Sequence, residues 1–447
     1  MWIIIALFAT SSIDGGHAKP RIMASMLASL GRVGVNGGRV VGIVLCVLAS
    51  HAWGQEPPPG GAQAQPPIAA YPLELLGLLA PPAQRGPLTV TPSIAVSEEY
   101  NDNIFANNRN RHWDFITSFT PAATLVVNRP SYQLSGGYSF AADLYAREDR
   151  LSNAFARQNF VANGLYRVAP GLTLTAADSF AFDRNANRLA SQSFSTGRQE
   201  LWTNTFTPGL MWQMTPRNSL SVSATYSVLR FEGAGGGNNS DTYGFLSSLS
   251  HAVTPRLTGL LGYGFTYLNI QRQGTSTTHT PTLGLSYQLT QTLTGTVAGG
   301  PAITESDGDT TVSPAGSASL VQTLPFGSAG IHYERSVSAA GGFGGATNTQ
   351  TAWGTLTLSG LQRGLLIVFN PIYSVAESVR SRQTQSIDVR TFTLNLAATY
   401  QIAAFASVFG GYTFFQQRTG RSSTTQLDID QNRIRFGLQF GYPITFD

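Results

Sequence analysis

Few side chains in this sequence could do chemistry, and the most suggestive are charged residues at alternate positions of apolar segments. Arg433 and Arg435 are separated by one residue, and Gln439 continues the alternation. His332 and Glu334 repeat the spacing further upstream. Residues two apart in an extended strand point to the same side, so each set shares one face. Arginines that line a polar interior attract anions or acidic saccharides. Inward charges that pair with one another would instead only stabilise the wall of the barrel. The sequence leaves both interpretations open. Further candidates for such a lining are Arg157, Arg167, Arg230 and Arg272.

A second group of polar residues lies in the segment EEYNDNIF at 98–105. Carboxylate and amide oxygens are ligands that calcium takes, and a cation held there could bridge lipopolysaccharide phosphates. The alternative is a structured loop held by Asx turns, in which Asn and Asp side chains accept hydrogen bonds from the nearby backbone. Because the segment lacks the spaced ligand set of a calcium-binding loop, we favour Asx turns and predict no metal site. The residues concerned are Glu98, Glu99, Tyr100, Asn101, Asp102, Asn103 and Phe105.

The sequence shows no catalytic motif. It contains no His-Glu-x-x-His, no Gly-x-Ser-x-Gly and no phosphate-binding loop, and the histidines His112, His251, His279 and His332 lie in no motif with a serine or aspartate partner. We therefore predict that the protein is not an enzyme and needs no cofactor.

The elements that must position these residues are long alternating strands. From Ile434 to Phe446, apolar and polar residues take turns without a break. A strand of a soluble sheet is usually about five or six residues long, whereas a tilted strand that crosses a bilayer needs about 9–11. Only 12% of the residues are charged, there are 47 glycines, and the mean hydropathy is close to zero. Because the two faces of an alternating strand cancel in any average, this composition favours a membrane β-barrel.

The N-terminal region differs from the rest. Residues 1–54 are predicted to be a leader with a secretory signal, whose true start is Met23 or Met26 and whose apolar core is Val40–Ala49. The single cysteine, Cys46, lies in that core, so the mature chain would hold no disulfide. Residues 55–87 are rich in proline and predict an extended periplasmic segment, and the barrel is expected over 88–447.

The basic charge does not indicate nucleic-acid binding. Four of the 28 basic residues and one of the 24 acidic residues fall in the predicted leader, so the remaining chain is close to neutral. We expect no nucleic-acid partner.

Two kinds of connection alternate after Leu88. Eight are short and most carry proline, glycine or asparagine, as tight turns do; nine are long and polar. The pattern predicts an all-β, antiparallel, up-and-down transmembrane barrel of about 18 strands, with short periplasmic turns and long outer loops. The last strand is expected to pair with the first, near Leu88–Val96, because lipid cannot hydrogen-bond to the unpaired backbone groups of an open sheet edge. Asp178 departs from the pattern because it falls in phase with lipid-facing residues, so we expect a bulge near Ala176–Ala177 or a shifted register.

The stretch SIAVSEEYNDNIFA at 93–106, followed by DFITSFTPAATL at 114–125, resembles the outer-membrane β-barrel porins associated with exopolysaccharide systems in proteobacteria. In that family the first strand ends in an acidic-Tyr-Asx-Asp-Asn-hydrophobic-Phe stretch, and a Thr-Pro pair lies in the second strand, here Thr120 and Pro121. The motif covers a small part of the chain. The resemblance implies a barrel in the outer membrane of a Gram-negative bacterium.

Two functions follow as expectations. The first is a channel for passive diffusion of small or anionic solutes, with polysaccharide export as its finer form. The alternative is a closed structural or surface-interaction barrel without channel activity. The expected partners are outer-membrane lipid and lipopolysaccharide, polysaccharide, and the barrel-assembly machinery, which would recognise the C-terminal strand with its aromatic Phe446.

Overall fold

The computed structural model describes residues 87–185, 194–232, 237–271, 273–306, 308–339, 342, 345–379, 386–420 and 427–446. The predicted leader, with Cys46, lies outside the described residues, as does the proline-rich segment up to residue 86. Arg272 lies outside them as well.

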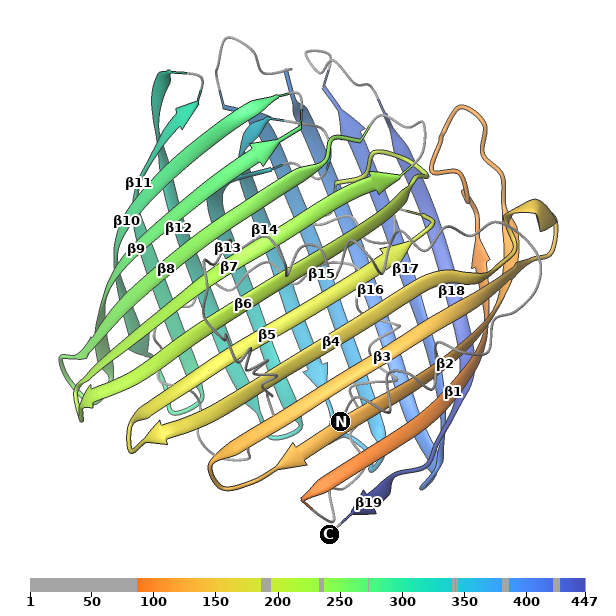
Figure 1. Ribbon diagram of the computed structural model, residues 1–447, viewed down its shortest axis with the longest axis horizontal. Coiled ribbons are helices and arrows are strands. Elements are labelled where there is room, and N and C mark those ends of the chain that lie inside the picture. The colour runs from red at the N-terminus through yellow and green to blue at the C-terminus, as the bar shows by residue number, and fades with distance from the viewer. Residues whose placement is uncertain are drawn as a thin grey trace, which may run out of the picture. The chain divides into compact units, whose positions relative to one another are not determined.

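The described chain is almost entirely β-strand (Figure 1). Its one helical element is a single 3-10 turn, η1 (Asp149–Leu151). No helix in the described part is long and apolar enough to cross a membrane. The strands are β1 (Leu88–Asn101), β2 (Asp114–Asn128), β3 (Tyr132–Tyr145), β4 (Asn153–Ala169), β5 (Leu172–Asp183), β6 (Glu200–Thr215), β7 (Asn218–Glu232), β8 (Ser240–Ala252), β9 (Leu257–Ile270), β10 (Gly274–Gln288), β11 (Leu293–Ser306), β12 (Asp309–Leu324), β13 (Gly327–Ala339), β14 (Ala346–Leu358), β15 (Leu365–Ser378), β16 (Asp388–Ala403), β17 (Ala406–Thr419), β18 (Ile429–Gly441) and β19 (Ile444–Phe446).

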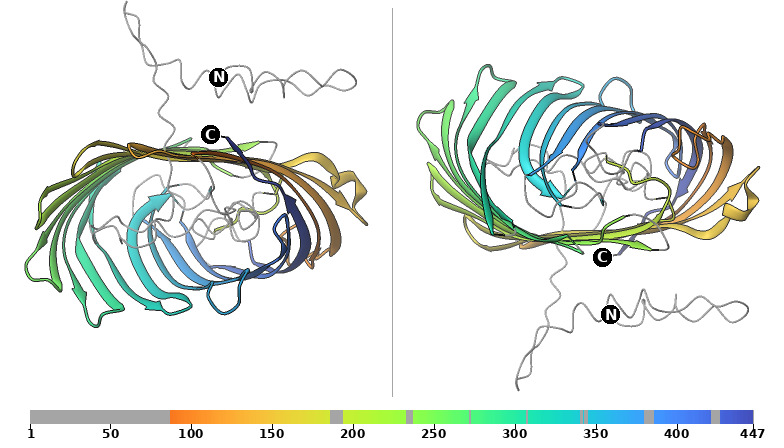
Figure 2. Two further views of the ribbon diagram at one scale, coloured as in Figure 1. Left: turned by 90° about the horizontal axis from the view of Figure 1, so that it is seen from below. Right: turned by 90° about the horizontal axis from the view of Figure 1, so that it is seen from above.

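Each strand from β1 to β17 pairs antiparallel with the next along the chain, and β1 pairs with both β18 and β19. The sheet therefore closes on itself, and its wall surrounds an interior when seen from below or from above (Figure 2). Because β18 and β19 occupy one position in the wall, the barrel has 18 strands, as predicted. Seven of the nine connections predicted to be long have six or more residues between their strands. The prediction is wrong for the loops expected around 272–278 and 305–309, because only three residues separate β9 from β10 and only two separate β11 from β12.

The closing strand is interrupted once, which the sequence pattern did not predict. β18 ends at Gly441 and β19 begins at Ile444, with Pro443 between them. The register against β1 does not shift, since Ser93 pairs with Gly441 and Val90 with Ile444. The break follows from chemistry, because proline has no N–H to donate to the ladder.

The two faces of the wall differ in polarity. On β18 the side chain of Arg435 is 5% exposed, whereas its neighbours Ile434 and Phe436 are 49% and 62% exposed. Other inward positions carry hydroxyls that bond across strands, such as Thr351 to Ser374 at 3.1 Å. The outer face carries large apolar side chains, including Leu261, Leu283, Leu285, Val297, Val312 and Ile331. This division is the one that a barrel in lipid needs around a wet interior.

Asp178 lies on the outer face, and the predicted bulge near Ala176–Ala177 is wrong. β5 pairs residue by residue with β4 and β6 through this region, and Asp178 stands opposite the outward-facing Phe206. The side-chain amide of Asn204 donates a hydrogen bond of 2.7 Å to its carboxylate. The carboxylate is thus accommodated on the outer face by a polar partner on the same face, and the strand register does not shift as the sequence pattern led us to expect.

Candidate functional site: the lining of the barrel interior

The predicted pore-lining residues of the closing strand face the interior. Arg433, Arg435 and Gln439 alternate on β18 with exposed apolar residues. The Nε of Arg435 donates a hydrogen bond of 2.9 Å to Ser97 Oγ on β1, and Glu99 stands directly opposite Arg435 in the register. The arginine is therefore held against the seam of the barrel, beside an acidic residue.

His332 and Glu334 also face the interior, from β13. The outward neighbours Ile331 and Tyr333 are exposed, while the ring of His332 stacks on the buried Trp353 with 5.0 Å between centroids. β13 lies between β12 and β14, away from the seam where β18 meets β1. The structure thus places the predicted residues in two separate parts of the lining and does not bring them together.

A buried ion pair between β3 and β4, with a serine of β2, links three neighbouring strands on the inner face. The Nη2 of Arg157 on β4 lies 2.7 Å from the carboxylate of Asp143 on β3, and both side chains are almost completely buried. Ser118 on β2 accepts a hydrogen bond from Arg157 and donates one to Asp143. Because Arg157 is paired and hydrogen-bonded within the wall, it is a poor candidate for binding a solute.

Of the other described arginine candidates, Arg230 is outside the lining, and Arg167 shares the inner face of β4 with Arg157 but lies at the rim next to a short turn. Arg230 lies on the outer face of β7 and forms an ion pair of 2.6 Å with Asp241. Arg167 is exposed next to a short turn and donates a hydrogen bond to the carbonyl of Pro130.

The EEYNDN segment is held by Asx turns and by the barrel seam. The Oδ1 of Asn101 accepts from the backbone N–H of Asn103, and the Oδ1 of Asn103 accepts from that of Asn107, each at 3.0 Å. Asp102 accepts from the backbone and the side chain of Asn432 at 2.7 and 2.8 Å. No group of three or more His, Cys, Asp or Glu suited to a metal occurs among the described residues. The segment thus bonds the end of β1 to the start of β18.

The apolar part of the same segment folds against the inner wall. Ile104 is fully buried against Ile116 and Tyr145, with Phe105 packed beside them. Glu98 has a different role, since it lies on the opposite side of β1 from Glu99 and accepts a hydrogen bond from Thr117. Tyr100 shares that outer side and packs its ring against Phe115, with centroids 5.4 Å apart.

The connection between β5 and β6 reaches the far side of the barrel. Phe194 is fully buried in a cluster with Ala376 on β15 and Val389 on β16. The side chain of Gln417 on β17 bonds both the N–H and the carbonyl of Ser195, at 2.8 and 2.9 Å. Since β5 and β6 stand across the barrel from β15 to β17 (Figure 1), this connection passes over the interior.

Arg198, in the same connection, joins it to the first loop. Its guanidinium donates to the carbonyl of Ile104 at 3.0 Å and lies over the ring of Tyr145. The described residues 194–198 of this connection therefore fill part of the barrel interior. Sequence reasoning missed Phe194, Arg198 and Gln417, and the one available signal was an aromatic residue within a polar loop.

The described histidines take part in separate contacts. His112 lies 3.4 Å from Glu148, His251 bonds Asn218 and His279 bonds Tyr263. None of these contacts joins a histidine to a serine.

No family model matches the sequence, and no curated protein matches it. Several solved structures are similar in backbone. Pseudomonas aeruginosa OpdQ aligns with a TM-score of 0.42 and 12% identity over 80% of this chain and 98% of its own. P. aeruginosa OccK11 (OpdR) aligns with a TM-score of 0.39 and 12% identity over 81% and 98%. The FrpB iron transporter from Neisseria meningitidis aligns with a TM-score of 0.40 and 8% identity over 79% and 82%. We draw no function from these similarities, and the fold assignment rests on the strand pairing itself.

Proposed function

We propose that this protein is a passive channel of the Gram-negative outer membrane, through which small hydrophilic solutes diffuse. The observation that carries the proposal is the closed 18-strand wall with an apolar outside and a polar inside. Barrels of 16–18 strands are wide enough to leave an aqueous channel. Small hydroxyl side chains along the inner face, such as Thr391 and Thr393, would keep that path wet.

The charges at the barrel seam support a weak preference for anions. The carboxylate of Asp143 is occupied by Arg157, and that of Asp114 accepts hydrogen bonds from the backbone of Arg147 and Glu148. At the seam, two arginines on β18 face one carboxylate, that of Glu99, in the register. This local excess of cationic groups favours anions at the seam, whereas Glu334 on β13 is an acidic group in a separate part of the lining.

Single-channel recording in a planar bilayer tests this function. We expect the protein purified from membranes to give a steady current, and a salt gradient to show modest anion preference. Arg433→Gln with Arg435→Gln should reduce that preference, whereas Arg363→Gln, on an exposed short turn, should not. If heat-modifiable gel mobility shows that the protein is folded and it still gives no current, that result would contradict the channel. Unchanged selectivity in the double variant would contradict only the role of the arginines.

We also propose polysaccharide as the finer substrate class, and the support for it is the sequence resemblance. An acidic oligosaccharide that enters the channel should block the current in discrete events, whereas a neutral one of equal length should block it less. No blocking by either would contradict export. Recognition by the barrel-assembly machinery through the closing strand, and contact with lipopolysaccharide at the long-loop end, remain predictions.

A further inference from the structure

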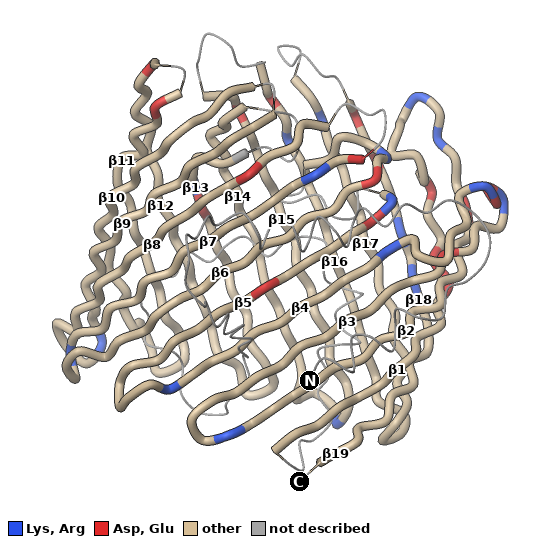
Figure 3. The backbone as a smooth tube through the Cα atoms, viewed as in Figure 1, with Lys and Arg blue, Asp and Glu red and all other residues tan. Residues whose placement is uncertain are grey.

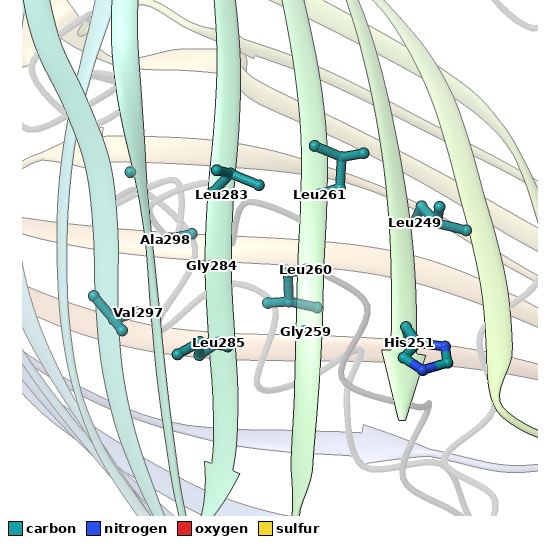
Figure 4. A pocket seen from close by; sticks show the side chains of 11 residues that line it. Leu249, His251, Gly259, Leu260, Leu261, Leu283, Gly284, Leu285, Val297 and Ala298 are labelled. Carbon is teal, nitrogen blue, oxygen red and sulfur yellow. The ribbon is translucent and has the colours of Figure 1, made fainter. Parts of the chain in front are cut away.

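The outer face of strands β8 to β11 carries an apolar groove. It has a volume of about 650 Å³, which is within the range of ligand sites, roughly 300–1,000 Å³. Its sides are large apolar residues that are well exposed on the barrel's outside: Leu249, Leu261, Leu283, Leu285 and Val297. Gly259 and Gly299 lie between these side chains and leave the space open, and Figure 4 shows the lining. A groove with this lining fits a hydrocarbon chain.

One end of the groove is polar. His251, at the end of β8, belongs to the lining, and its Nδ1 lies 2.7 Å from the Oδ1 of Asn218. The carbonyl of Arg217 accepts from the N–H of Ala252, the residue after His251, at 2.8 Å. The carbonyl of Arg256 accepts from the N–H of Gln288, near Leu285, at 2.9 Å. Two exposed arginines on neighbouring short turns thus flank the histidine end of the groove.

The described short connections of the barrel carry arginines and no acidic side chains. The eight short connections contain no Asp or Glu. Five exposed arginines lie in or beside these connections: Arg129, Arg167, Arg217, Arg256 and Arg363. Figure 3 shows blue but no red segments at this end, and red segments gathered toward the long connections. Arginine is well suited to phosphate because its planar fork of donors matches the oxyanion.

We propose that this groove is a binding site for one anionic phospholipid of the leaflet at the short-turn end. One acyl chain lies over Gly259 and Gly299, and the phosphate lies at His251 between the turns of Arg217 and Arg256. An apolar groove that ends in cationic groups matches an acyl chain that ends in a phosphate, and this order along the wall is why an anionic phospholipid fits the site. The site does not depend on whether the interior conducts.

Native mass spectrometry of the full-length chain, expressed and purified from membranes, tests the site. The probes are dioleoylphosphatidylglycerol, dioleoylglycerol without a phosphate, and inorganic phosphate without chains. We expect saturable binding of phosphatidylglycerol, with dioleoylglycerol and inorganic phosphate each much weaker. Arg217→Gln with Arg256→Gln should weaken it about tenfold, because hydrogen bonds to a charged group are lost. Arg129→Gln, on a distant short turn, is the matched control and should have no effect.

The groove itself is tested by filling it. Gly259→Leu with Gly299→Leu should also weaken binding about tenfold, because part of the acyl chain is excluded. A Cβ at Gly259 would meet nothing nearer than a carbonyl at 4.0 Å, so Gly259→Leu serves alone if the double variant does not fold. Gly136→Leu, on the outer face of β3, is the control. Equal phosphatidylglycerol binding by all variants, or equal binding of dioleoylglycerol, would overturn the site; loss in the arginine variant alone would overturn the groove.

Discussion

Asp178, a carboxylate on the outer face of the wall, shows how much one residue can depend on its neighbour. Asp178 is not compensated by any change of register, and the partner described for its side chain is Asn204, which also donates to the carbonyl of Ser179. Ionisable groups are costly on the lipid side of a barrel, although less so for Asp than for Arg or Lys. The pair is therefore expected to lower stability relative to an apolar wall.

A double-mutant cycle measures this cost. Asn204→Leu alone should destabilise the barrel by about 1–3 kcal/mol, because it removes the side-chain donor to the carboxylate of Asp178. Asp178→Leu with Asn204→Leu should be more stable than the natural protein, since neither polar group then faces lipid. Urea unfolding from phospholipid vesicles, followed by tryptophan fluorescence, gives the free energies. A double variant less stable than Asn204→Leu would show that the pair supports packing that an apolar pair cannot replace.

At the scale of elements, the end of β1 and the start of β18 form one polar clasp. Asn103 donates to the carbonyl of Asp430 at 2.9 Å, and Gln431 bonds both Asn101 and Asn103. Hydrogen bonds between side chains here add to the backbone ladder at the place where the barrel closes. The segment that resembled a family motif therefore has a mechanical role at the seam.

Removing one member of the clasp should loosen the seam. Asn103→Ala eliminates the side-chain bonds to Asn107, Asn108 and Asp430 and should lower the free energy of unfolding by about 2–3 kcal/mol, since each bond contributes about 1. Asn107→Ala is the matched control, because its side chain is exposed and bonds only its own loop. The temperature at which the folded band disappears in heat-modifiable electrophoresis reports the change. Equal shifts for both variants would contradict a special role of the seam.

The parts of this fold that sequence predicts are those with a local cause. Strand count, turn order and the inward placement of Arg435 follow from a two-residue period that repeats along the chain. The clasp and the contact between Ser195 and Gln417 join residues more than 200 positions apart, and no local period records such a pairing. The groove escaped prediction for another reason, because Gly259 and Gly299 become neighbours of the same space only when β9 and β11 flank β10.

At the scale of the whole molecule, the connection between β5 and β6 is expected to set the width of the proposed path, because it is fastened to the opposite wall. The ring of Phe194 and the two bonds of Gln417 fasten the connection after β5 to the far wall. A connection fastened at both sides is expected to narrow the opening and to keep it constant. If this connection were released from the opposite wall, the opening would be wider and its width would vary more.

Phe194→Ser with Gln417→Ala should therefore raise single-channel conductance and its noise while the barrel stays folded. Gln416→Ala is the control, because Gln416 lies on the other face of β17 and bonds Asp430 rather than the loop. The reason is steric, since removing one buried apolar contact and two hydrogen bonds leaves the loop free to leave the path. Paired recordings of both variants and the natural protein decide the matter. Higher conductance in the double variant alone would assign the constriction to this connection, and identical currents in all three would place the narrowest point elsewhere in the lining.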